Sequence, residues 1–96
     1  MSVFETIAIQ IIRGQEFVIG PLAWSEAQKV PGIVVDTVQG RVTLSGDGKA
    51  VVNLLVAQYE RLFGHASHEV CIDAATASIK NLPPSDIPTS LLTEHD

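Results

Sequence analysis

Alternation of apolar and polar residues is clearest at positions 41–45. Val42 and Leu44 share one face of this stretch, and polar side chains occupy the other face. Such alternation is typical of a strand with one side in water. A β-branched run at 33–38 precedes it, and Gln39-Gly40 between them suits a tight turn. The pattern therefore predicts a β-hairpin over 33–45.

Residues 48–63 carry the strongest helical pattern. Their apolar positions recur at helical spacing and form one broad face, made of Val51, Val52, Leu55, Val56, Tyr59, Leu62 and Phe63. Asp47 can cap the first turn with its carboxylate, and Gly64 is a favoured residue at a helix C-terminus. Leu54 falls outside the main face, so we expect it at the surface.

A shorter helix is predicted from Gly20-Pro21 to about Val30. Proline near the first helical position costs no hydrogen bond, and Pro31-Gly32 ends the pattern. Trp24 lies at the edge of the apolar face of this helix.

Residues 5–19 fit two patterns. Ile7, Ile9 and Ile11 alternate with other residues, as in a strand, while Ile7, Ala8 and Ile11 also fit a helical stripe. The β-branched content favours a pair of strands that turn at Arg13-Gly14. The helical alternative stays open.

Residues 69–74 alternate again and predict a last strand, after which Pro83-Pro84 ends regular structure. The predicted fold class is α+β: an antiparallel sheet of about five strands in the order ββαββαβ, with two helices on one face. One domain would span 1–82. An acidic, proline-containing tail would span 83–96 and be dispensable for folding.

The stretch 31–75 resembles a BON domain. That family has a hairpin with a G-x-V-x-L-x-G signature, matched here by Gly40, Val42, Leu44 and Gly46, followed by a helix, a glycine and a closing strand. The resemblance implies binding of phospholipid or of partner proteins, usually in an envelope setting. A roadblock-type dimerisation domain is a second fit, through the hairpin–helix order.

Composition narrows the function classes. The chain has 96 residues, 46% of them hydrophobic, and a net charge of −5. Its six Lys and Arg residues are scattered singly, which argues against nucleic-acid binding. The apolar stretches are too short to span a membrane. One cysteine allows no intrachain disulfide, and the N-terminus lacks a signal-like pattern, so we expect a cytoplasmic protein.

Possible metal ligands gather near one another in the sequence, at His65, His68, Glu69, Cys71 and Asp73. Zinc needs about four convergent ligands, and no second paired-ligand motif is present. Cys71 beside a histidine would be a candidate nucleophile, but its neighbours are acidic and an activated thiol needs electropositive surroundings. We therefore expect no catalytic residues, metal or other cofactor, although metal binding by His65, His68 and Cys71 stays open.

The segment around Gly46, Gly48 and Lys49 resembles a phosphate-binding loop at a helix start, but the full motif is missing. A small-ligand or anion-binding domain is thus the alternative function. The preferred hypothesis is a small non-catalytic module that binds a partner protein or itself as a homodimer. Trp24 and Leu54 are the expected interface residues.

Overall fold

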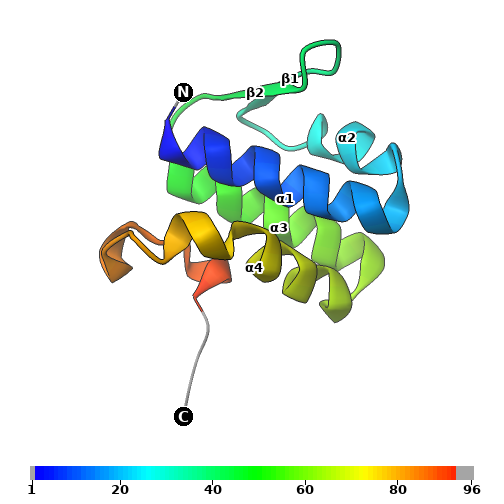
Figure 1. Cartoon of the computed structure of the whole chain (residues 1–96). Coiled ribbons are helices and arrows are strands. Elements are labelled where there is room, and N and C mark those ends of the chain that lie inside the picture. The colour runs from blue at the N-terminus through cyan, green and yellow to red at the C-terminus, as the bar shows by residue number, and fades with distance from the viewer. Residues whose placement is uncertain (1, 93–96) are drawn as a thin grey trace.

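The computed structural model describes residues 2–92 (Figure 1). The elements are α1 (Val3–Ile19), α2 (Leu22–Ala27), β1 (Ile33–Asp36), β2 (Arg41–Leu44), α3 (Gly48–Phe63), α4 (His65–Ile79) and two 3-10 turns at Pro84–Asp86 and Thr89–Leu91. Helices α1 and α3 lie side by side, and α4 packs against both (Figure 1). The hairpin and α2 lie across the other side of α1.

The predicted five-stranded sheet is wrong. Within residues 2–92 the only sheet is the two-stranded hairpin, in which β1 and β2 pair antiparallel with Ile33 opposite Leu44. The order ββαββαβ is therefore replaced by a mainly helical arrangement. The hairpin agrees with the sequence prediction, but its strands are joined by the four residues 37–40 rather than by a tight turn at Gln39-Gly40. Helix α3, with Asp47 and Gly64 at its ends, also agrees.

The first predicted strand pair is one helix, α1. Ser2 caps it reciprocally with Glu5. The isoleucines at both the two-residue and the four-residue spacing are buried, namely Ile7, Ile9, Ile11 and Ile12. They are buried because α1 packs against other elements on several sides. A buried isoleucine gains about 1.5–3 kcal/mol, whereas its lower helix propensity costs less than about 0.7 kcal/mol. Burial therefore outweighs the β-branched preference for strands.

The last predicted strand is also helical, because residues 69–74 belong to α4. Its fully buried positions are small residues four apart, namely Ser67, Cys71 and Ala75. Such residues let two helices approach closely. Gly14 of α1 lies at this crossing, where an added Cβ would be only 2.8 Å from the Cβ of Ala74. Gly14 thus serves helix packing rather than the predicted turn.

Residues 83–92, the described part of the predicted tail, pack back against the helices. Leu91 is only 1% exposed and belongs to the core together with Leu55 and Tyr59 of α3. Asn53 accepts hydrogen bonds from the backbone N–H and the hydroxyl of Ser90, at 3.0 and 2.6 Å. We therefore expect this segment to contribute to the stability of the fold.

None of the described helices combines the length and the apolar content needed to cross a membrane.

Candidate functional site

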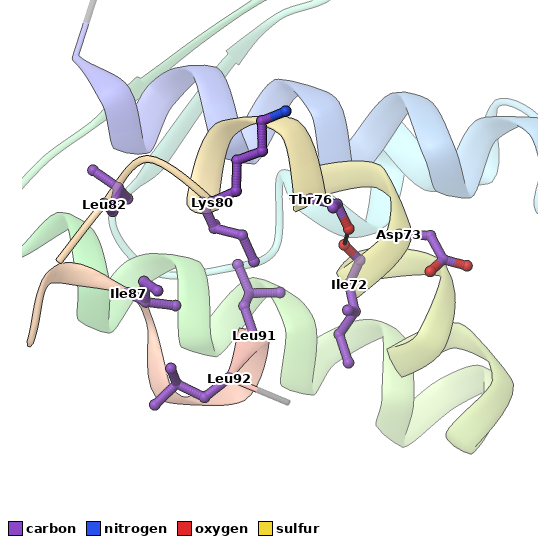
Figure 2. Close-up of a pocket in the computed structure, with 9 residues that line it drawn as sticks. Ile72, Asp73, Thr76, Lys80, Leu82, Ile87, Leu91 and Leu92 are labelled. Carbon is purple, nitrogen blue, oxygen red and sulfur yellow. Dashed lines mark hydrogen bonds between the residues drawn. The ribbon is translucent and has the colours of Figure 1, made fainter. Parts of the chain in front are cut away.

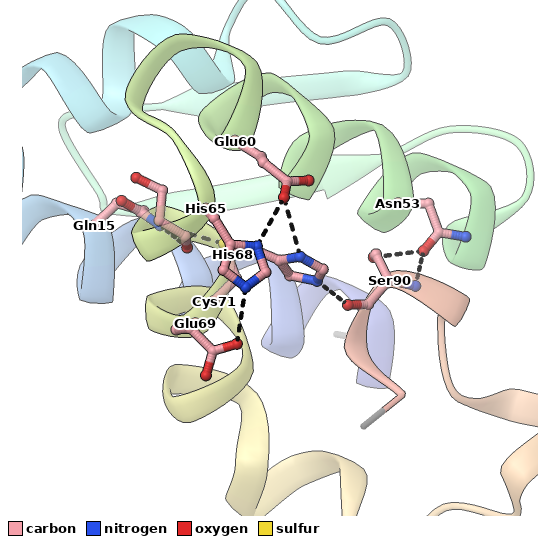
Figure 3. Close-up of polar contacts among 9 residues, drawn as sticks. Gln15, Asn53, Glu60, His65, His68, Glu69, Cys71 and Ser90 are labelled. Atoms are coloured by element: carbon pink, nitrogen blue, oxygen red, sulfur yellow. Dashed lines mark hydrogen bonds and ion pairs between the residues drawn. The ribbon is translucent and has the colours of Figure 1, made fainter. Parts of the chain in front are cut away.

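The α3–α4 junction brings together a polar cluster that we call the histidine corner: Glu60, His65, His68 and Glu69 (Figure 3). Gly64 alone separates the two helices and has a φ of +88°, in the region that favours glycine. The last turn of α3 and the first turn of α4 therefore meet at a sharp angle. Glu60 faces both histidines as a result.

One carboxylate oxygen is the centre of the histidine corner. The Nδ1 atoms of His65 and His68 each lie 3.4 Å from Oε2 of Glu60. On the other side of the His65 ring, Nε2 lies 3.8 Å from Oε2 of Glu69. The ligand atoms of Glu60, His65 and His68 all lie within 4.8 Å of one another.

His68 is also held from its outer side. Its Nε2 forms a short hydrogen bond with the backbone carbonyl of Ser90, which is itself held by Asn53 (Figure 3). A carbonyl oxygen can only accept, so Nε2 of His68 must carry the hydrogen. The contact links the histidine corner to the C-terminal segment.

Cys71 and Asp73 lie apart from this cluster. The Sγ of Cys71 accepts a hydrogen bond from Nε2 of Gln15, at 3.2 Å, and the same amide nitrogen bonds the carbonyl of Ser67, at 2.8 Å. Burial raises the pKa of the Cys71 thiol to about 11. The thiol is therefore neutral and a poor nucleophile or ligand at neutral pH.

Sequence reasoning thus found three residues of the histidine corner, His65, His68 and Glu69, and missed the fourth. Glu60 lies on the polar face of the long helix and gave no signal by itself. Its position five residues before His65, with a helix-ending Gly64 between them, was the available clue. That clue has meaning only if residues 65–79 form a helix, which the sequence did not predict.

A second candidate surface is the apolar end, defined as Phe17, Val18 and Leu22 around the α1–α2 turn. Their exposed fractions are 94%, 63% and 45%. A hollow of about 330 Å³ adjoins this turn and is lined by Glu16, Pro21, Trp24, Ser25, Gln28 and Thr37. Trp24 lines the hollow and also packs against the core.

Leu54 projects from α3 with 47% of its surface exposed. It lies on a different element from Trp24. Its sequence neighbours Asn53 and Leu55 are half-buried and buried, so Leu54 is not part of a run of exposed apolar side chains like Phe17 and Val18.

The C-terminal groove lies between α4 and the segment that follows it (Figure 2). It has a volume of about 460 Å³ and is lined by Ile72, Asp73, Thr76, Ile79, Lys80, Leu82, Ile87, Leu91 and Leu92. The lining is mainly aliphatic, with Asp73 and Lys80 contributing opposite charges.

At the start of α3, Gly48 and Lys49 are engaged in contacts of their own, whereas Gly46 has a φ of +82° and nothing within 4 Å of an added Cβ. The carboxylate of Asp47 accepts the N–H of Lys49 at 3.0 Å. The Lys49 ammonium donates to the carbonyl of Ser85, and Gly48 lies against the ring of Phe4. These contacts explain the glycine and the lysine through packing and through attachment of the C-terminal segment.

No protein-family model matches the chain, and comparisons with curated proteins and with solved structures give no match either. The resemblance of residues 31–75 to a BON domain, and the second fit to a roadblock-type domain, stay hypotheses from the sequence. Function must be inferred from the surfaces of the chain itself.

Proposed function

We propose that this chain is a small non-catalytic protein-interaction module that forms a homodimer through the apolar end. The observation that carries the proposal is the exposure of Phe17, Val18 and Leu22 within six positions. Single exposed apolar side chains are common in monomers. A group of them that includes an almost fully exposed phenylalanine is typical of an interaction site.

The apolar end suits a second copy of the chain because the projecting Phe17 side chain lies next to the hollow described above. Phe17 projects from the last turns of α1, and the hollow lined by Pro21 and Trp24 adjoins the same turn. In a two-fold dimer the same patch meets itself. Phe17 of each copy would then enter the hollow of the other, where Pro21 and Trp24 offer apolar contacts beside the polar side chains that make up the rest of its lining.

The magnitude expected for this contact is modest. Full burial of a large apolar side chain gains about 1.5–3 kcal/mol. A two-fold dimer would bury Phe17, Val18 and Leu22 of both copies. Association costs about 4–15 kcal/mol in lost freedom of motion. We therefore expect a reversible dimer with a dissociation constant of roughly 1–1,000 µM.

The net charge predicts how the dimer should depend on salt. Each copy carries a net charge of −5, so repulsion opposes association at low salt and the dimer should tighten as salt is added. The neutral, buried Cys71 gives no reason to invoke catalysis. We place the module in the cytoplasm, as the sequence led us to expect.

Sedimentation equilibrium over about 1–1,000 µM protein, the range expected above, tests the proposal. The unsubstituted chain should dimerise, and Phe17→Asp should be monomeric over the same range. Because Phe17 is 94% exposed in the monomer, Phe17→Asp should melt within a few degrees of the unsubstituted chain.

Leu54→Asp is the matched control. Leu54 is about half exposed but lies on α3, away from the α1–α2 turn, so this change should leave the dimer intact. Dimerisation that survives Phe17→Asp but is lost in Leu54→Asp would move the interface to α3. A chain that stays monomeric throughout would refute self-association.

A further inference from the structure

The histidine corner contains a contact that its own hydrogen-bonding groups do not explain. Because Nε2 of His68 donates to the carbonyl of Ser90, a neutral His68 ring has a lone pair at Nδ1. That lone pair faces Oε2 of Glu60, which is also an acceptor, at 3.4 Å. Two acceptors that face each other repel unless a proton or a metal ion lies between them.

The spacing suits a shared metal ion. An N–H···O hydrogen bond has a typical nitrogen–oxygen distance of about 2.7–3.2 Å. Two ligands that are each about 2.1 Å from a tetrahedral zinc ion lie about 3.4 Å apart. Both histidine Nδ1 atoms lie 3.4 Å from the Glu60 oxygen, which matches the spacing of two ligands on one ion, and the three ligand atoms lie within 4.8 Å of one another.

The outer nitrogens of both rings face oxygen atoms. Nε2 of His68 is bonded to the Ser90 carbonyl, and Nε2 of His65 lies 3.8 Å from the Glu69 carboxylate. Histidines that bind metals commonly donate their other N–H to a carbonyl or carboxylate, which orients the ring and strengthens the ligand. In His68 this hydrogen bond directs Nδ1 toward Glu60, and in His65 the Glu69 carboxylate lies on the side of the ring away from Glu60 (Figure 3).

We propose that the histidine corner binds one divalent transition-metal ion of the zinc class through Nδ1 of His65, Nδ1 of His68 and Oε2 of Glu60. Imidazole and carboxylate suit zinc and its neighbours in the first transition row better than they suit calcium or magnesium, which prefer sets of oxygen ligands. Three protein ligands leave a fourth position for water or for a group from outside the chain.

The surroundings permit a cation to bind and exchange. The His65 side chain is 76% exposed, so the ion can enter from solvent. Glu69 adds a second negative charge nearby. Arg61, the adjacent cation, donates instead to the side chain of Gln58 at 2.7 Å. We therefore expect an exchangeable site.

Calorimetric titration of chelator-treated full-length protein with Zn²⁺ is the test, with Mg²⁺ and Ca²⁺ as hard-cation controls. Zn²⁺ should bind with one ion per chain, whereas Mg²⁺ and Ca²⁺ should not bind. Because the ligands come from two helices, Zn²⁺ at 100 times its dissociation constant should also raise Tm by about 10 °C.

Three variants assign the ligands, and one serves as control. His65→Ala, His68→Ala and Glu60→Gln should each weaken Zn²⁺ binding at least tenfold. Since His65 is largely exposed, His65→Ala should remain folded by circular dichroism even if His68→Ala disturbs the C-terminal segment. His95, the third histidine of the chain, lies outside the described residues, and His95→Asn should bind Zn²⁺ like the unsubstituted protein.

Glu69→Gln tests the outer contact and should weaken binding less than Glu60→Gln does. Absence of zinc binding would overturn the proposal, and the Glu60 contacts would then be ion pairs with protonated histidines. Zinc binding that persists in both His65→Ala and Glu60→Gln but is lost in His95→Asn would also overturn it.

Discussion

Replacement of Leu91 by alanine should destabilise the protein strongly, although the sequence places this residue in a tail. Leu91 is 1% exposed and is packed by α3 and α4. Leu→Ala at a buried site costs about 2–5 kcal/mol, because apolar contacts are lost and a cavity remains. For a domain of this size each kcal/mol lowers Tm by about 4–8 °C. Leu91→Ala should therefore lower Tm by roughly 10 °C or more.

The neighbouring leucine supplies a matched control. Leu92 is 41% exposed, so Leu92→Ala should change the free energy of unfolding by less than about 0.5 kcal/mol. Thermal and urea unfolding of both variants, followed by circular dichroism, measures the difference. Equal shifts in Leu91→Ala and Leu92→Ala would refute the burial of Leu91 as a stabilising contact.

A chain that ends at Leu82 should lose still more stability. It lacks Leu91, and it also lacks Ser90, which bonds Asn53 and His68. A truncated chain that melts within a few degrees of the full-length protein would restore the expectation of a dispensable tail.

Two further predictions concern the packing of α4. Burial raises the pKa of Cys71 from its ordinary value of 9.0 to about 11, so the neutral thiol contributes stability below pH 9 that should be lost as pH rises toward 11. Unfolding and thiol-reagent rates measured across that pH range would check it. Gly14→Ala should destabilise the protein by about 1–2 kcal/mol, because overpacking against Ala74 exceeds the gain of about 1 kcal/mol in helix propensity. The double variant Gly14→Ala with Ala74→Gly should recover most of the lost free energy of unfolding, as measured by urea unfolding.

The elements that were predictable are those whose local signals and tertiary surroundings agree. In α3, the cap at Asp47, the apolar face and the end at Gly64 all indicate the same boundaries. In the hairpin, one face of β2 packs inward at Val42, so alternation describes real burial. Local and global preferences coincide there.

The elements that were mispredicted are those in which tertiary packing decides. Helix α1 is buried on several sides, so its isoleucines at both two- and four-residue spacings are inside, and the sequence shows both periods at once. Helix α4 buries Ser67, Cys71 and Ala75, which are too small or too polar to give a marked apolar stripe. Periodicity could identify neither helix without knowledge of its neighbours.

The same reasoning explains the candidate sites. Trp24 and the helix start at Lys49 were visible from residue type, whereas the role of Phe17 depends on the exposure of a residue that the predicted strand would have placed in a sheet. Glu60 joins the histidines only because Gly64 turns one helix directly into the next.

The C-terminal segment couples stability to the proposed metal site. Leu91 fills the core, and the adjacent Ser90 holds the outer nitrogen of His68, so one short turn contributes to both. If the docked segment favours metal binding, the metal must favour docking by the same free energy, since coupling between two binding events is reciprocal. Docking of this segment and metal binding at the histidine corner are then linked events. The groups that link them are Glu60 on α3, His68 on α4 and Ser90 beyond α4.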